Sequence, residues 1–212
     1  MKIFQKHYEP LDFNDLVFAD SSTRQRLLEY AENKRHGSML FYGPYGTAKT
    51  TTAKIIAQER SAGLGFRGDN FYRATDLSNA SFQRIANTRR LDLFAGVQLP
   101  VTIVDEIDKV PDDLQYKLRW ELDLNCEVGT FIFTTNKLHA VEPGLRHRCD
   151  IVELPLANTS HWLDRARWIL EQEGISRSDA KLLELIEGGD GSIRDLLRKL
   201  EDISLRAPRV AA

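Results

Sequence analysis

A lysine and a threonine, Lys49 and Thr50, follow a glycine-rich turn that comes directly after a short apolar run, Met39 to Tyr42. The run has the length of one buried strand, and residues 51–59 have the composition of a helix. In a strand, turn and helix of this kind, the backbone N–H groups of the turn and the helix N-terminus form a site for anionic oxygens. The lysine would contact the terminal phosphates of a nucleotide, and the threonine hydroxyl would bind Mg²⁺. The pattern therefore predicts a nucleoside triphosphate site.

One position of this turn departs from the pattern, which has glycine directly before the lysine where this chain has Ala48. Taken alone, the turn leaves open a chance match, or a loop that no longer binds nucleotide. The residues expected to contact the phosphates are Gly43, Pro44, Tyr45, Gly46, Thr47, Ala48, Lys49, Thr50 and Thr51.

Two carboxylates, Asp105 and Glu106, end a second apolar run over residues 99–104. Unbroken apolar runs are typical of buried parallel strands, and ligands bind at the C-terminal ends of such strands. We expect Asp105 to hold Mg²⁺ and Glu106 to polarise an attacking water. The alternative is a loop that is acidic by chance, but a pair about 55 residues after a phosphate loop favours the catalytic reading.

A third apolar run, Thr130 to Thr135, ends at Asn136. If this strand neighbours the one before Asp105, its amide would lie beside the reacting phosphate, whereas the alternative is an ordinary turn asparagine. Three arginines, Arg84, Arg89 and Arg90, lie on a helix predicted over residues 81–94. A solvated face accounts for them most simply, and the sharper hypothesis is a patch that contacts nucleic-acid phosphates.

Strands and helices alternate from residue 38 to residue 154, which predicts a mostly parallel sheet flanked by helices. After Pro155 the pattern changes to three helices, predicted over residues 159–173, 178–187 and 193–204. We therefore predict an α/β domain over residues 1–155 and a small three-helix domain over residues 156–212. The first 20 residues are expected to form an extended arm, because Pro10 disfavours a helix at the residue before it.

The overall composition is that of an ordinary globular protein. The 212 residues carry a net charge of −2, so any contact with DNA would come from a local basic patch. Only two cysteines are present, Cys126 and Cys149, and their spacing excludes a zinc ribbon. There is no signal peptide and no long apolar run, so a cytoplasmic location without membrane association is the default expectation.

Together these motifs resemble the AAA+ ATPases, and within them the clamp-loader branch of replication factor C small subunits and bacterial polymerase III loader subunits. The resemblance covers nearly the whole chain, with every motif in the family's order. The matching segments are residues 6–10 (K-Y-R-P), 43–50 (G-P-P-G-T-G-K-T), 74–76 (A-S-D), 101–106 (Walker B), Asn136 (sensor 1), 148–149 (the R-C of S-R-C) and 191–195 (G-S-L-R-D of sensor 2).

This resemblance implies a parallel P-loop sheet with a helical lid, and ATP and Mg²⁺ as ligands. Tyr8 and Val17 would lie near the adenine, Asn136 would orient the attacking water, and Arg194 of the lid would contact the γ-phosphate. Arg148 would act on the ATP of a neighbouring AAA+ subunit, with Arg146 as the alternative. The implied partners are further AAA+ subunits in a homo- or hetero-oligomer, DNA along Arg84, Arg89 and Arg90, and a sliding clamp.

Several departures from the clamp-loader pattern leave alternatives open. Tyr45 replaces a proline and His147 a serine, while the alanine at position 48 also occurs in the MCM and MoxR groups of AAA+ ATPases. The chain ends at Ala212, before the collar of clamp-loader subunits, so we expect either a fragment or assembly through the ATPase modules alone. The competing functions are a nucleotide-binding stator with little hydrolysis and a remodeller of a protein client encoded on a mobile element. The presence of Lys49 and of the Asp105–Glu106 pair favours a hydrolysing, DNA-associated switch.

Overall fold

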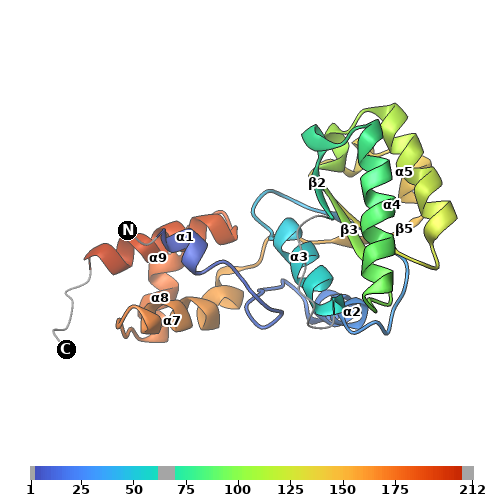
Figure 1. Ribbon diagram of the computed structural model, residues 1–212. Coiled ribbons are helices and arrows are strands. Elements are labelled where there is room, and N and C mark those ends of the chain that lie inside the picture. The colour runs from blue at the N-terminus through green and yellow to red at the C-terminus, as the bar shows by residue number, and fades with distance from the viewer. Residues whose placement is uncertain (1–2, 62–69, 207–212) are drawn as a thin grey trace. The chain divides into compact units, whose positions relative to one another are not determined.

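The computed structural model describes residues 3–61 and 70–206, which form two compact units (Figure 1). The α/β unit comprises Ser21–Gly43 and Lys49–Leu154. The helical unit comprises the described residues up to Asp20, the segment Pro44–Ala48 and the described residues from Pro155 onward. These units differ from the predicted domains in two places, since the N-terminal 20 residues and the centre of the glycine-rich turn group with the helical unit.

The α/β unit is built on a five-stranded parallel sheet with the order β2-β3-β4-β1-β5. The apolar runs become its central strands because their side chains are buried on both faces, and all six residues of β4 are buried. The predicted α/β fold is confirmed. The strands are β1 (Ser38–Tyr42), β2 (Phe71–Arg73), β3 (Val101–Asp105), β4 (Thr130–Thr135) and β5 (Cys149–Glu153).

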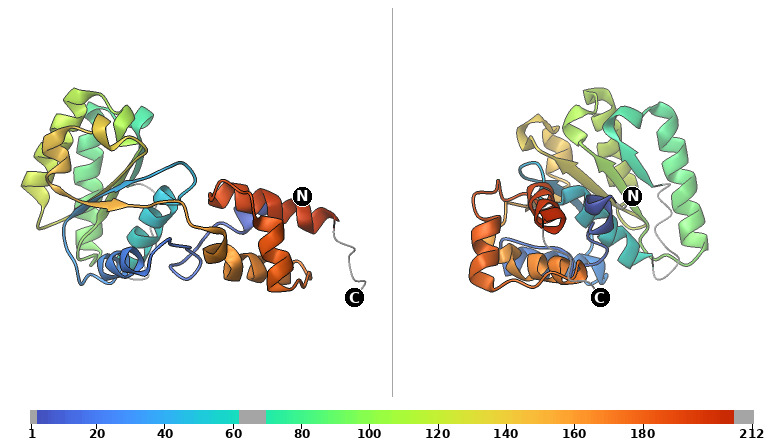
Figure 2. Two further views of the ribbon diagram at one scale, coloured as in Figure 1. Left: turned by 180° about the vertical axis from the view of Figure 1, so that it is seen from behind. Right: turned by 90° about the vertical axis from the view of Figure 1, so that its left-hand side faces the viewer.

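Helices cover both faces of this sheet (Figure 2). On one face, Leu40, Val104 and Phe133 pack in one core with apolar side chains of α4 and α5. Residues of the opposite parity, such as Ile103 and Phe41, point to the other face, where α3 packs against β3 and β4. The helices are α2 (Ser21–Ala31), α3 (Lys49–Arg60), α4 (Asn79–Phe94), α5 (Asp112–Asn125) and α6 (Pro143–Arg146).

The helical unit contains the three helices predicted after Pro155, namely α7 (Leu163–Gln172), α8 (Asp179–Ile186) and α9 (Ile193–Arg206). The first of them is preceded by a 3₁₀ turn, Thr159–Trp162, which Asn158 caps instead of the predicted Thr159 and Ser160. The extended arm was wrong at residues 4–7, which form the short helix α1 (Phe4–His7). Phe4 packs in the apolar core of this unit, so burial of one aromatic side chain orders the segment. Among the helices in the described ranges, none is long and apolar enough to cross a membrane.

Candidate active site

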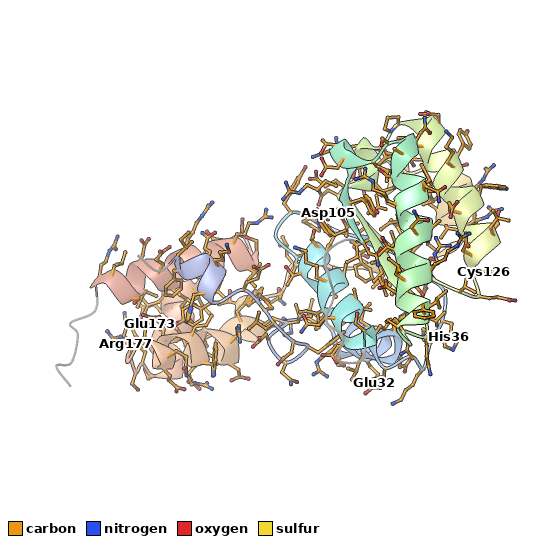
Figure 3. All side chains as sticks on the ribbon, in the orientation of Figure 1. Glu32, His36, Asp105, Cys126, Glu173 and Arg177 are labelled. Atoms are coloured by element: carbon orange, nitrogen blue, oxygen red, sulfur yellow. The ribbon has the colours of Figure 1, made fainter. Side chains whose placement is uncertain are left out.

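Three hydroxyl and carboxylate side chains meet at the C-terminal edge of the sheet. Val104 pairs with Phe133, so the next residues, Asp105 and Thr134, lie side by side on the face covered by α3. The Thr134 hydroxyl donates to Oδ1 of Asp105 at 2.6 Å, and the Thr50 hydroxyl donates to the same oxygen at 2.5 Å. Strands β3 and β4 and helix α3 thus place one carboxylate oxygen between two hydroxyls; Asp105 is labelled in Figure 3.

Lys49, the first residue of α3, lies at the same edge. Only 8% of its surface is exposed, although lysine is among the residues that are rarely buried. Its Nζ donates to the carbonyl oxygen of Gly43 at 2.9 Å, across the turn that joins β1 to α3. A buried ammonium held at a strand end, next to a helix N-terminus, is suited to contact an anionic oxygen.

Two glycines of the turn are required by close contacts. A Cβ on Gly43 would lie 2.2 Å from the carbonyl oxygen of Leu154, at the end of β5. A Cβ on Gly46 would lie 2.3 Å from Cβ of Ser192, just before α9. Both glycines also have positive φ angles, of +148° and +80°. The turn therefore admits no side chain at either position.

Ala48 has a φ angle of +60°, in the left-handed region. This backbone geometry accounts for the glycine that the pattern has here, because the left-handed region costs a residue with a Cβ about 1–2 kcal/mol. The departure in the sequence therefore keeps the loop conformation and adds local strain.

Within the helical unit, the centre of the turn is bonded to the start of α9. The Ile193 N–H donates to the carbonyl oxygen of Gly46 at 3.0 Å. The predicted lid arginine, Arg194, follows directly and is partly exposed on the first turn of α9. The two motifs on either side of this hydrogen bond, the phosphate turn and the lid helix, are thus joined through backbone atoms.

Glu106 follows β3 in a left-handed conformation, with φ +60° and ψ +49°. Its backbone N–H donates to the Thr134 hydroxyl at 3.0 Å, so the same threonine orients both acidic residues. The carboxylate forms an ion pair with Lys109 at 2.7 Å. To act as a base, Glu106 would have to leave this partner. Non-glycine residues in this region of φ/ψ space are concentrated at functional sites.

Asn136 follows β4, and β4 lies between β3 and β1, so the condition for its predicted role is met. Its Oδ1 is buried without a hydrogen-bond partner among the described residues. A buried polar atom without a partner costs about 1–3 kcal/mol, and a bound polar group would remove that penalty. The preceding Thr135 is held by its hydroxyl, which donates to Asp108 at 2.7 Å.

Arg148 lies at the opposite edge of the sheet. It directly precedes Cys149, which pairs with Ser38, whereas the phosphate turn begins after Tyr42, four residues along the same strand. At about 3.3 Å per residue, the start of β5 is roughly 15 Å from the phosphate edge. The Arg148 side chain therefore lies far from its own chain's turn.

Helices α5 and α6 hold the Arg148 guanidinium at the surface. Its Nε donates to Asp123 of α5 at 2.5 Å, and Nη1 donates to the carbonyl oxygen of Gly144 in α6 at 2.9 Å. The hydrogen bond to Asp123 raises the pKa of Arg148 and lowers that of Asp123. The alternative, Arg146, is partly buried, and its Nε has no hydrogen-bond partner among the described residues.

One predicted nucleic-acid contact needs correction. Arg89 was expected to track nucleic acid, but only 6% of its surface is exposed, and it pairs with Glu121 of α5 at 3.4 Å. Its position on the inner side of α4 makes it a bridge between two helices. Arg84 and Arg90 are exposed.

Tyr8 was expected near an adenine, but its side chain is a buried core residue of the helical unit. Its hydroxyl donates to Glu173, and burial together with this bond raises the pKa of Tyr8 above its usual value. Val17, predicted beside it, packs partly buried against the same core. Both residues thus hold the N-terminal segment on the helical unit.

The cluster of Thr50, Asp105 and Thr134 suits Mg²⁺, which prefers hard oxygen ligands. Over residues 3–61 and 70–206, the structure contains no group of three or more His, Cys, Asp or Glu side chains able to hold a metal ion. This composition fits a Mg²⁺ site, because Mg²⁺ is usually bound through one or two protein ligands together with water and substrate phosphates. Thr134 was missed by the sequence reasoning, although it shares the parity of Asp105 on the adjacent strand.

Comparison with known proteins decides the family of this arrangement. Residues 39–155 match the ATPase family associated with various cellular activities, or AAA. The chain belongs to the AAA family. The matched segment contains the phosphate turn, both acidic residues, Asn136 and the two candidate arginines, so the AAA motifs and the polar cluster coincide.

Among curated AAA proteins, the chain is similar to replication factor C subunits. It is 27% identical to a replication factor C small subunit of Thermofilum pendens, over 96% of this chain and 63% of that protein. It is 24% identical to replication factor C subunit 3 of Oryza sativa, over 96% of this chain and 57% of that protein. The chain thus spans about 60% of the length of these relatives. The predicted resemblance to this group of AAA proteins is confirmed.

Solved structures show the same fold in a more distant protein. RuvB of Thermotoga maritima aligns with a TM-score of 0.69 and 17% identity, over 92% of this chain and 64% of that one. A second structure of the same protein aligns with a TM-score of 0.65. At this identity the comparison supports the AAA fold alone.

Proposed function

We propose that this chain binds ATP with Mg²⁺, hydrolyses it, and acts as a nucleotide-driven switch among like subunits. The observation that carries the proposal is the cluster of Thr50, Asp105 and Thr134, with buried Lys49 at the same sheet edge. These residue types supply the two things that phosphoryl transfer requires, namely metal ligands and a cation for the terminal phosphates.

In the proposed mechanism, Lys49 and the backbone of the turn bind the phosphates, while Thr50 and Asp105 hold Mg²⁺. The metal would neutralise charge on the phosphate oxygens. Glu106 exchanges its partner Lys109 for the attacking water and takes up its proton, and the Asn136 amide orients that water. Thr134 keeps Asp105 and Glu106 in place by bonding to both. Arg194, at the start of α9, contacts the γ-phosphate.

The arginine that completes the site comes from another subunit. Arg148 is held at the far edge of the sheet by Asp123, which supports action on a neighbour's nucleotide. A finger supplied by another chain contributes on the order of 10³-fold or more to the rate, so a lone subunit would hydrolyse ATP slowly. Arg146 is the alternative finger.

The client is proposed from the relatives and from the surface. The similarity to replication factor C subunits favours a clamp-loader-like role on DNA in replication or repair, with a sliding clamp among the partners. Exposed Arg84 and Arg90 on α4 suit DNA phosphates. Leu91 and Phe94, exposed at the end of the same helix, suit a protein partner.

A second candidate, a nucleotide-binding stator with little hydrolysis, is favoured by two observations. Glu106 is paired with Lys109, and Ala48 adds strain to the phosphate turn. The remodeller of a protein client has no such specific support beyond the apolar end of α4.

The test is the ATPase rate per subunit against protein concentration, measured alone, with primed DNA and with candidate protein clients. We expect a rate that rises with concentration and rises further with primed DNA. A fast rate that is independent of concentration would exclude the finger in trans. ATP binding with no turnover under any of these conditions would favour the stator. Stimulation only by a protein would favour the remodeller.

A further inference from the structure

Helix α5 has apolar side chains on two opposite faces. Its inner face is buried in the core of the α/β unit through Leu114, Leu118 and Leu122. On the outer face, Tyr116, Trp120 and Leu124 follow one another at four-residue spacing and are 51%, 62% and 57% exposed. We call these three residues the α5 stripe. A surface helix usually has one apolar face, so a second one is unusual.

The α5 stripe is large enough to matter energetically. An aromatic side chain buries 150–250 Å² when covered, so the three partly exposed side chains leave roughly 300 Å² of apolar surface in one row. A contiguous apolar patch of this size marks an interaction site, whereas single exposed apolar residues are ordinary. The acidic Asp113 and Glu127 are exposed on the same helix and the turn after it, as a polar rim would require.

The stripe is continuous with Arg148. Asp123, which accepts the hydrogen bond from Arg148, is next to Leu124 and three residues from Trp120. Between them, Arg119 lies over the Tyr116 ring at 5.1 Å and pairs with Glu142 beside α6. A molecule that receives the Arg148 guanidinium therefore also lies over the outer side of α5.

We propose that the α5 stripe docks a second copy of this chain, so that Arg148 of the first copy reaches the nucleotide of the second. This inference rests on the proposed function, because only a nucleotide site on another copy gives Arg148 a use at this edge of the sheet. The contact is head-to-tail, since the stripe faces the nucleotide-binding side of the next copy and does not pair with itself. Its roughly 300 Å² would form the apolar centre of an interface of about 800 Å² per partner.

The experiment is a mixing assay between two inactive variants. Lys49→Ala cannot bind ATP but keeps Arg148, and Arg148→Ala binds ATP but lacks the arginine. Mixing them should restore turnover at least about 30-fold over the sum of the separate rates. Adding Trp120→Glu to the Lys49→Ala copy should remove this restoration. The same change in the Arg148→Ala copy should leave at least half of it, because the stripe acts on the side that donates the arginine.

The matched control is Phe94→Glu in the Lys49→Ala copy, since Phe94 is 94% exposed on the neighbouring helix. It should leave the restoration intact. Equal effects of Trp120→Glu in the two copies, or no effect in either, would overturn the proposal.

A second measurement separates this proposal from the function on which it rests. If mixing restores nothing, sedimentation of the unmodified chain and of Trp120→Glu, with ATP, decides the docking surface directly. Weaker self-association of Trp120→Glu, by about 30-fold or more, would keep the stripe as a docking surface and remove Arg148 as the finger. Unchanged self-association, or none in the unmodified chain, would overturn the stripe while ATP binding by single copies stands or falls in its own assay.

Discussion

The two edges of the parallel sheet differ in how their polar groups are satisfied. At the C-terminal edge, Asp105 is held by two hydroxyls from its own chain, and Lys49 is buried against the phosphate turn. At the N-terminal edge, Arg148 is exposed beside the apolar α5 stripe. The first edge is a site built within one chain, whereas the second is a surface that offers residues to another molecule. The difference indicates that one chain carries two complementary halves of a catalytic centre.

The largest expected effect is at the C-terminal edge. Lys49→Ala removes the buried cation, so we expect ATP affinity to fall by about 100-fold or more, because hydrogen bonds to charged groups are the strong ones. Titration with a fluorescent ATP analogue measures it. Lys54→Ala, on an exposed side of the same helix, is the control and should bind normally. Equal binding by Lys49→Ala would mean that the phosphates are held elsewhere.

The N-terminal edge should affect turnover without affecting binding. Arg148→Ala is expected to lower the ATPase rate of the assembled protein on the order of 10³-fold, with ATP affinity unchanged. Arg146→Ala, measured in parallel, distinguishes the two candidates. A loss with Arg146→Ala and none with Arg148→Ala would move the finger to α6.

Glu106→Gln should lower turnover about 100-fold and keep ATP binding, because it removes the base and leaves the metal ligands in place. Single-turnover hydrolysis of labelled ATP separates the two steps. Lys109→Ala is the informative companion, since it frees Glu106 and should leave the rate unchanged or raise it a few-fold. Normal turnover by Glu106→Gln would remove Glu106 as the base.

Tyr8→Phe tests a region outside both edges. It should lower the stability of the helical unit by about 1 kcal/mol, through loss of the hydrogen bond to Glu173, and leave ATP affinity unchanged. The pKa of Tyr8 is raised in the folded protein, so its contribution is fully present below about pH 10 and is lost as the pH rises. Urea unfolding of both proteins between pH 7 and pH 11 should therefore show a difference that changes only above about pH 10. Weaker ATP binding by Tyr8→Phe would restore its predicted contact with the nucleotide.

The smallest effect is expected at Ala48. Ala48→Gly relieves the left-handed strain but adds backbone freedom to the unfolded chain, so stability should change by less than about 1 kcal/mol. Thermal unfolding measures this change, and ATP affinity should stay within a few-fold. A change of 10-fold or more in affinity would show that the alanine controls binding itself.

The parallel sheet and the edge where its polar residues gather could be predicted from the sequence, because unbroken apolar runs that end in Asp105 and Asn136 are typical of buried parallel strands. The bonds from Thr134 to both acidic residues could not, since they depend on the register between β3 and β4. The burial of Arg89 likewise depends on the rotation of α4 against α5, and three arginines on one predicted helix do not reveal which one faces inward. Tyr8 is set by a bond to Glu173, 165 residues away, which no local pattern contains.

The division between the two compact units falls inside the phosphate turn, between Ala48 and Lys49. The backbone passes from one unit to the other at a residue whose φ angle is +60°. Glycine at this point would have both halves of φ space open to it, whereas alanine is confined to a small part of the positive half. The unusual letter of the motif therefore reduces the number of conformations available to the joint, and makes position 48 a place where one methyl group can set how freely the chain pivots.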